Sequence, residues 1–250
     1  MRILKTITSN IFSCYYLFRE MLAPSHIKEG KEIPIIINNF NRLTTLKQLI
    51  EALTSRGYTN IYIIDNASTY PPLLDYYKTC PFTVFKLSQN LGFKALWKSS
   101  LRKRFCNDYY IYTDSDVVPC SYCPQDFIDY FLKELKKYPL ARKVGFSLRI
   151  DNIPDTYAHK DKVIKQEKKY YESPKGELYR APIDTTFALY RPRVGLSRSR
   201  SVEAYRTAYP YQAEHLPWYC DSAHLSEEEQ YYINQCTHVT EWSSKSKKQL

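Results

Sequence analysis

Two carboxylates stand one residue apart in the string Asp114-Ser115-Asp116, directly after the apolar segment 109–113. On a regular strand both side chains face the same side, and at a strand end they can share one cation directly or through water. Carboxylate oxygens favour Mg²⁺ or Mn²⁺ over zinc. A chain of this composition contains an Asp-x-Asp string by chance roughly 0.6 times, so the string alone is a weak signal. The prediction of a metal site rests on the position of this string directly after a strand. The alternative is a solvated turn.

Strands and helices alternate through the first half of the chain. Segments 33–37, 61–64, 82–87 and 109–113 are short, apolar and rich in β-branched or aromatic residues, as buried strands are. Leucine and isoleucine at helical spacing within 43–53 predict a helix after the first strand. Because crossovers must join strands that helices separate, the sequence predicts an α/β fold with a mainly parallel sheet flanked by helices.

Polar residues follow three of these predicted strands. They are residues 38–42 after the first strand, Asp65 and Asn66 after the second, and Asp114 with Asp116 after the fourth. In a parallel α/β sheet, ligands bind beyond the carboxyl ends of the strands. We therefore expect these groups to line one ligand site.

The second half of the chain has a weaker pattern. Segments 144–148 and 185–190 are expected to be strands, and 126–137 a helix. After Arg191 the pattern gives way to a basic region that contains tyrosine and proline. We find no internal repeats and expect one domain.

Four short motifs in the first half resemble those of one enzyme family. They are Asn39-Phe40-Asn41-Arg42, Asp65-Asn66-Ala67-Ser68, Asn90-Leu91-Gly92-Phe93 and Asp114-Ser115-Asp116. Their order and spacing resemble the amino-terminal half of a family 2 glycosyltransferase of the GT-A fold. The resemblance covers about 85 residues. It implies a Rossmann-like GT-A sheet, a nucleotide-diphosphate sugar as donor, and Mn²⁺ or Mg²⁺ held at the Asp-x-Asp motif.

The chemistry of these positions agrees with the resemblance. By resemblance Asp65 lies beside the nucleobase, where a carboxylate can accept from a base N–H or a ribose hydroxyl. Its alternative role is to cap the turn after its strand. Arg42 either faces the diphosphate or opens the first helix, and a phosphate near Lys94 would gain from a helix start. The expected donor-binding residues are Asn38, Asn39, Arg42, Asp65, Asn66, Asn90, Gly92, Lys94, Asp114 and Trp218.

The catalytic base and the third metal ligand are expected in the second half. Inverting transfer needs a carboxylate that removes the proton of the acceptor hydroxyl. The family usually places it in a Glu-Asp pair, which the chain lacks after Asp116. The string Ile183 to Tyr190 resembles strings downstream of the Asp-x-Asp in some related bacterial transferases, so the resemblance makes Asp184 the first candidate base, with Glu214 second and Asp151 third. The string His215-Leu216-Pro217-Trp218-Tyr219 resembles a late loop that completes the metal site in related folds. By this resemblance His215 would join Asp114 and Asp116 as a metal ligand, and Trp218 is either a platform for the sugar or a core residue.

The first 22 residues carry an apolar stripe with helical spacing. A transmembrane helix needs ~20 apolar residues, and no run in the chain is apolar enough over that length. We expect residues 1–24 to form an amphipathic helix that either docks on the protein or lies on a membrane interface. Residues 25–250 would form the transferase domain, with a nucleotide-sugar-binding half at 25–120. An acceptor-binding half and a carboxyl-terminal lid would occupy 121–250.

The net charge of +10 indicates an anionic partner, which could be a nucleic acid, a membrane surface or a phosphate-bearing ligand. An odd number of cysteines, seven, favours reduced thiols and a cytoplasmic location. If the helix at 1–24 lies on a membrane, the protein would be peripheral on its inner face.

The residues and the resemblance together predict a metal-dependent glycosyltransferase that moves a sugar, most simply from a UDP-sugar, to a glycan or lipid-linked hydroxyl. Inversion is what the resemblance alone implies. One alternative is a sugar-phosphate nucleotidyltransferase, although residues 38–42 lack the glycines typical of that class. The other is a basic nucleic-acid-binding protein, for which we find no recognisable module, so we expect no nucleic-acid partner.

Overall fold

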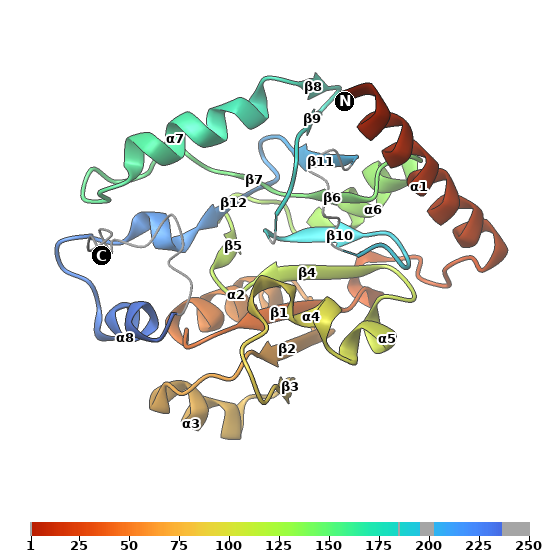
Figure 1. Ribbon diagram of the computed structural model, residues 1–250. Coiled ribbons are helices and arrows are strands. Elements are labelled where there is room, and N and C mark those ends of the chain that lie inside the picture. The colour runs from red at the N-terminus through yellow and green to blue at the C-terminus, as the bar shows by residue number, and fades with distance from the viewer. Residues whose placement is uncertain (1, 185, 196–202, 237–250) are drawn as a thin grey trace.

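A computed structural model describes residues 2–184, 186–195 and 203–236 (Figure 1). The helices are α1 (Arg2–Leu22), α2 (Thr44–Thr54), α3 (Pro71–Thr79), α4 (Ala95–Lys98), α5 (Leu101–Phe105), α6 (Phe127–Lys137), α7 (Lys160–Lys168) and α8 (Glu227–Gln235). Short 3-10 helices are η1 (Gly30–Glu32), η2 (Gly92–Lys94), η3 (Lys169–Tyr171) and η4 (Leu216–Tyr219).

The strands form two sheets in the described part of the chain. Nine of them make one sheet in the order β3-β2-β1-β4-β10-β6-β11-β9-β8, and three make a second in the order β5-β12-β7. The strands are β1 (Ile35–Asn39), β2 (Ile61–Asp65), β3 (Thr83–Lys86), β4 (Tyr110–Asp114), β5 (Val117–Pro119), β6 (Lys143–Gly145), β7 (Ser147–Leu148), β8 (Pro174–Lys175), β9 (Leu178–Arg180), β10 (Ala188–Tyr190), β11 (Ala204–Thr207) and β12 (Gln212–His215).

The first four strands are parallel, as the sequence predicts. In the register of β1, Asn39 lies opposite Asp65 of β2, and Asn38 lies opposite Asp114 of β4. The carboxyl ends of these strands therefore lie at one edge of the sheet. The α/β class and the sheet flanked by helices are confirmed.

The second half of the large sheet mixes directions. Strand β10 is antiparallel to both β4 and β6, while β11 is parallel to β6. The single strand expected at 144–148 is in fact two strands, because the chain leaves the large sheet after Gly145 and joins the small sheet at Ser147. An antiparallel insertion of this kind cannot be found from periodicity, because a short apolar run looks the same in either direction.

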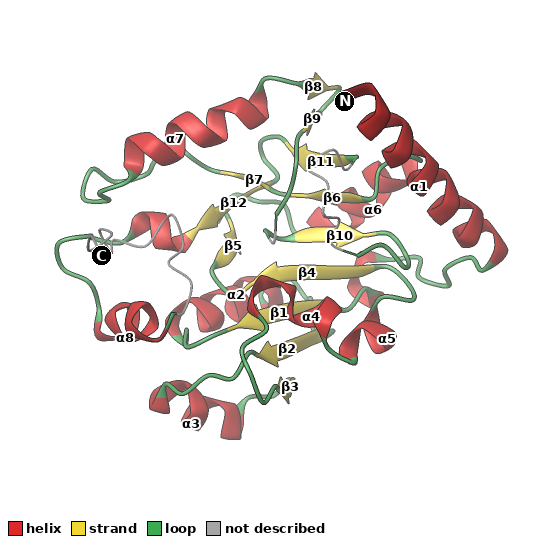
Figure 2. Ribbon diagram, viewed as in Figure 1, coloured by secondary structure: helices red, strands yellow, loops and turns green. Residues whose placement is uncertain are grey.

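Alternating side chains of the strands fill two cores, one on each face of the sheet. Ile35 and Ile37 of β1 belong to the core under α2, α3 and α6, and Ile36 belongs to the core under α4 and α5 (Figure 2). The second core also contains three fully buried tyrosines, Tyr110, Tyr112 and Tyr190. Burial on both faces explains the continuous apolar runs of the central strands.

The helix start expected near Lys94 does not open one continuous helix. The structure has η2 and then two separate turns of helix, α4 and α5, with Ser99 between them in an extended conformation. The Ser99 hydroxyl donates to the Leu96 carbonyl, 3.3 Å away, which is the competition with the backbone that makes serine a poor residue for a helix interior. Helix starts this short supply little dipole to a phosphate.

The predicted amino-terminal helix is present as α1, and it contacts the rest of the chain through Ser13, Tyr16 and Glu20. Ser13 accepts from the Arg142 guanidinium at 3.2 Å, and Glu20 pairs with Arg191 at 2.9 Å. The apolar residues Ile11 and Phe18 are instead about 60% exposed. In the described part of the chain, no helix is both long enough and apolar enough to cross a bilayer.

Candidate functional site

Asp116, Arg42 and His215 lie together beyond the carboxyl ends of β1 and β4. The Nε of Arg42 and the Nε2 of His215 are each 3.7 Å from an Asp116 carboxylate oxygen. The small sheet brings the histidine there, because β12 pairs with β5 so that His215 lies opposite Val117. The Leu216 N–H also donates to the Asp116 carbonyl at 2.9 Å. Asp116 and His215, expected to act together, are therefore neighbours.

The three groups differ in charge. Burial lowers the pKa of His215, which the charge of Asp116 only partly opposes, so the imidazole is neutral at neutral pH. Burial alone would lower the pKa of Arg42, but the carboxylates of Asp116 and Glu229 outweigh it and keep the guanidinium charged. The site therefore holds a carboxylate, a neutral imidazole and a fixed positive charge.

Asp116 and His215 have donor atoms suited to a hard or borderline cation. Within residues 2–184, 186–195 and 203–236, the buried Asp116 Oδ1 and His215 Nδ1 have no hydrogen-bond partner. A neutral imidazole and a carboxylate can both ligate Mn²⁺, and Mg²⁺ or Mn²⁺ commonly takes only one or two protein ligands and completes its shell with phosphate oxygens and water. These two residues fit such an ion.

Asp114 is placed differently from Asp116. Its Oδ1 accepts from the Asn38 side-chain amide at 3.2 Å. No group of three histidine, cysteine, aspartate or glutamate side chains that could hold a metal is found among the described residues. Asp116 and His215 are neighbours in this structure, but Asp114 does not join them to form the expected trio.

Polar side chains tie the turn after β1 to the turn after β2. Asn41, with a positive φ of 52°, accepts through Oδ1 from the N–H groups of Thr69 and Tyr70 at 2.7 and 3.0 Å. Asn39 donates to the Tyr77 hydroxyl at 2.8 Å. That hydroxyl donates to Asp65 at 3.4 Å. Asn39 is fully buried in this network, so its contacts are internal to the protein.

Asp65 makes the contacts of a strand-end cap. Its Oδ1 accepts from the Ser68 N–H at 3.3 Å, and burial raises its pKa despite that contact. Asp65 is only 3% exposed. Its contact with a nucleobase stays a prediction.

Asn66 joins the second motif to the third. Its side-chain amide donates to the Gly92 carbonyl at 3.1 Å and accepts from the Leu91 N–H at 2.7 Å. Asn90 in turn accepts from the Gly92 N–H at 2.8 Å. Gly92 has a φ of +67°, which favours glycine there. Asn66, Asn90 and Gly92 are therefore grouped after β2, and the Lys94 ammonium lies 5.0 Å from the ring of its neighbour Phe93.

Trp218 lies in the core. It is 3% exposed, and its ring is 4.8 Å from the His215 ring. Trp218 thus has the position of a core residue, one of the two roles expected for it, and its ring packs against the ring of His215.

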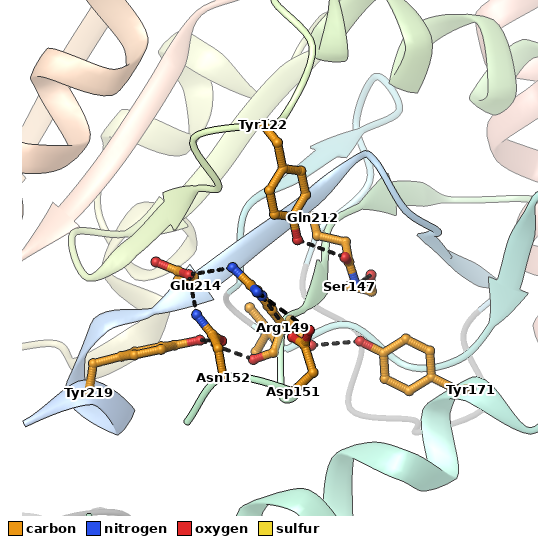
Figure 3. Close-up of polar contacts among 10 residues, drawn as sticks. Tyr122, Ser147, Arg149, Asp151, Asn152, Tyr171, Gln212, Glu214 and Tyr219 are labelled. Carbon is orange, nitrogen blue, oxygen red and sulfur yellow. Dashed lines mark hydrogen bonds and ion pairs between the residues drawn. The ribbon is translucent and has the colours of Figure 1, made fainter. Parts of the chain in front are cut away.

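Glu214 faces away from His215, as neighbours on a strand do. Its Oε1 accepts from the Asn152 amide at 3.0 Å and is 3.5 Å from Arg149 (Figure 3). Arg149 also binds Asp151 at 2.7 Å and thereby lowers the pKa of that carboxyl. The second and third candidate bases are thus held by one arginine.

Asp184 is exposed and lies beside a buried lysine. Lys143 donates from Nζ to the carbonyls of Ile183 and Asp184 and to the Tyr190 hydroxyl, at 2.5, 3.3 and 3.2 Å. Burial lowers the pKa of Lys143 to about 7, although the nearby Asp184 charge raises it. Asp184 and Asp151 are both exposed, but Asp151 is paired with Arg149.

The low pKa of Lys143 predicts that stability depends on pH. Unfolded lysine has a pKa near 10.4, so the unfolded chain binds more protons than the folded chain above pH 7, and stability rises with pH. We expect the free energy of unfolding of the wild type, relative to Lys143→Met, to increase by about 2 kcal/mol from pH 7 to pH 9. Urea denaturation of both proteins at the two pH values measures this. A constant difference would show that Lys143 is not perturbed.

Helix α8 brings to the site two residues, Glu229 and Tyr232, that the sequence did not indicate. Helix α8 lies beside the turn after β1, and its Glu229 accepts two hydrogen bonds from Arg42, at 2.6 and 3.2 Å. The Tyr232 ring of the same helix lies 3.9 Å from the Arg42 guanidinium. A capping signature could have located the helix, because Ser226 precedes Glu229 by three residues and its hydroxyl accepts from the Glu229 N–H.

No family model and no curated protein matches the chain. Among solved structures it is similar to GalNAc-T7, a structure with UDP, GalNAc and Mn²⁺, at 12% identity and a TM-score of 0.44 over 80% of this chain and 49% of that chain. It is similar to residues 1–349 of S. aureus TarS at 13% identity and a TM-score of 0.37, over 64% and 46% of the two chains. A cytidylyltransferase from Leptospira borgpetersenii serovar Hardjo-bovis matches at 10% identity and a TM-score of 0.37, over 64% and 60%.

The chain spans less than two thirds of each of these proteins. At such low identities and TM-scores the likeness carries no conclusion about activity or ligands. The function must therefore be argued from the site.

Proposed function

We propose that this protein is a metal-dependent glycosyltransferase of the GT-A type that moves a sugar from a nucleotide-diphosphate sugar, most simply UDP-linked, to a glycan or lipid-linked hydroxyl. The observation that carries the proposal is the meeting of Asp116, His215 and Arg42 at the carboxyl ends of parallel strands. This is where ligands bind in such sheets, and the charges suit a diphosphate with a cation. The four motifs that resemble family 2 enzymes lie at or after the carboxyl ends of β1, β2, β3 and β4, which are parallel strands of one sheet.

Asp116 and His215 would hold Mn²⁺ or Mg²⁺, with Asp114 nearby. A divalent cation at this place supplies charge neutralisation for a departing diphosphate. Arg42 adds a fixed positive charge that cannot be lost at any working pH. Asp65, Asn38 and Asn66 would contribute to binding the nucleoside, and the buried Asn39 would act by holding Asp65 through Tyr77.

The acceptor proton needs a carboxylate base. We retain Asp184 as the first candidate, because it is exposed, whereas Glu214 is engaged by Arg149 and Asn152. A base that removes this proton while the diphosphate departs on the opposite side of the sugar would give inversion.

The experiment for this proposal compares two ligands by thermal shift. UDP with Mn²⁺ should raise the melting temperature, and single-stranded RNA should not. Stabilisation by RNA alone would favour the nucleic-acid-binding alternative and would overturn the transferase.

Contact with an anionic membrane surface is a second part of the proposal, and the exposed apolar side of α1 supports it. Tyr15, Phe18 and Leu22 are at least half exposed on the side of the helix away from Ser13 and Glu20. A helix that lies in a membrane interface presents such a side, and a net charge of +10 favours anionic lipid. The protein would then act at the inner face of the membrane, with residues 1–24 as the contact and 25–250 as the transferase.

Flotation with phosphatidylglycerol vesicles tests the membrane contact. The full chain should float with the vesicles, and the variant Ile11→Ser, Phe18→Ser, Leu22→Ser should remain in the lower fractions. Equal flotation of the two proteins would contradict a role for α1.

A further inference from the structure

Two adjacent glutamates of α8 bind the segment that follows β1. Glu229 holds the Arg42 guanidinium through both carboxylate oxygens. Glu228 accepts from the Thr44 N–H through both of its oxygens, at 3.1 and 3.0 Å, and from the Thr44 hydroxyl at 2.9 Å. One short stretch of α8 thus places two negative groups, side by side, on Arg42 and on the first turn of α2.

The first turn of α2 is open to an anion because its own sequence does not cap it. Leu43 stands at the N-cap and has no side chain that could accept a hydrogen bond. The N–H groups of a first helical turn otherwise lack partners, and the helix dipole favours negative charge there. In this structure the Glu228 carboxylate takes the position of the missing cap.

Buried atoms at the same place lack hydrogen bonds, so the two carboxylates do not complete its contacts. Arg42 is only 6% exposed, and its Nε makes no hydrogen bond among the residues described, with Asp116 Oδ2 as an ion-pair neighbour 3.7 Å away. Within the same described ranges, the buried Oγ1 of Thr45, in the first turn of α2, also lacks one. A buried donor without a partner costs free energy, so an oxygen-rich ligand would be favoured here.

We propose that Arg42 and the first turn of α2, including Thr44, form the pocket for the donor's diphosphate, and that Glu228 and Glu229 fill this pocket as an internal substitute while no donor is bound. The inference rests on the proposed function for the identity of the anion. A diphosphate offers two adjacent negative groups, as Glu228 and Glu229 do. Donor and α8 would compete for the same groups. The donor's apparent affinity would then equal its intrinsic affinity multiplied by the fraction of molecules in which α8 is displaced.

Another residue of α8, Tyr231, contacts Thr69 and Tyr70 in the turn after β2. The Tyr231 hydroxyl donates to the Thr69 carbonyl at 3.1 Å and is 3.0 Å from the Thr69 hydroxyl. The Tyr231 ring lies 5.0 Å from the Tyr70 ring. These contacts attach α8 to the turn after β2, so α8 covers both turns of the site.

Calorimetric titration of the full chain tests the inference, with inorganic pyrophosphate and with UDP plus Mn²⁺ as separate ligands. The double variant Glu228→Gln, Glu229→Gln should bind each ligand at least about tenfold more tightly than the wild type. The matched control is Glu227→Gln, an exposed glutamate of the same turn, which should bind as the wild type does. Unchanged or weaker binding by the double variant would overturn the substitute role.

A second variant covers the case in which the double variant does not fold. Ser226→Ala removes the cap of α8 without touching either carboxylate and should tighten binding of both ligands several-fold. If Ser226→Ala binds both ligands as the wild type does, the inference is likewise overturned.

The outcomes separate this inference from the proposed function. If UDP binds the wild type and the variants equally, the transferase proposal stands and the substitute role fails. If pyrophosphate binds more tightly to the variants while UDP binds none of the proteins, the pocket stands and the nucleotide donor fails. If neither ligand binds any of the proteins, both proposals are wrong.

Discussion

Replacement of Asp116 by asparagine is expected to lower sugar-nucleotide turnover at least about 100-fold while the protein remains folded. Asparagine keeps the size of the side chain and one oxygen but removes the charge. Asp116 is the residue that both Arg42 and His215 approach, so this charge acts on the cation and on the guanidinium together. The stabilisation by UDP should also lose its dependence on Mn²⁺.

The matched control for this change is Asp155→Asn. Asp155 is almost fully exposed and pairs only with Lys160 on the surface, according to the contacts of the described residues. It should leave turnover and the Mn²⁺ response unchanged. Wild-type turnover by Asp116→Asn would show that Asp116 does not hold the metal.

Replacement of Arg42 by methionine is expected to destabilise the fold by about 3–5 kcal/mol. Methionine fills much of the space but leaves the largely buried carboxylates of Asp116 and Glu229 without their cation. Removal of one partner of a buried pair costs more than the pair itself contributes, because the remaining charge stays buried. Urea denaturation at neutral pH measures the loss.

A double-mutant comparison separates loss of charge pairing from loss of packing. If uncompensated charge is the cause, Arg42→Met, Glu229→Gln should be more stable than Arg42→Met alone. A double variant that is no more stable than the single variant would mean that Arg42 acts through its packing on Tyr232 instead.

The first half of the fold could be predicted from the sequence because each strand there is a short apolar run closed by polar residues. The register of β1, β2 and β4 then brings Asn38, Asp65 and Asp114 to one edge, as expected. The pairing of Asp116 with His215 could be predicted only through the family resemblance. Nothing in the local pattern indicates that β12 pairs with β5.

The second half was harder to predict for physical reasons. Strands β6 to β12 are two to four residues long, too short for a period to be visible. The sequence left open whether the helix at 1–24 docks on the protein or lies on a membrane. In the structure Glu20 and Ser13 make polar contacts and Tyr16 packs against the second core. The expected strand at 185–190 is shorter in the structure, Ala188–Tyr190, and Thr185 lies outside the described residues.

The identity of the released nucleotide tests the central claim most directly. The protein is incubated with a panel of sugar nucleotides, a mixture of candidate acceptors and Mn²⁺, and the products are identified by mass spectrometry. We predict that one sugar nucleotide yields its nucleoside diphosphate, and that EDTA stops the reaction. Pyrophosphate released from a nucleoside triphosphate and a sugar phosphate, with no nucleoside diphosphate from any sugar nucleotide, would contradict the account and identify a nucleotidyltransferase.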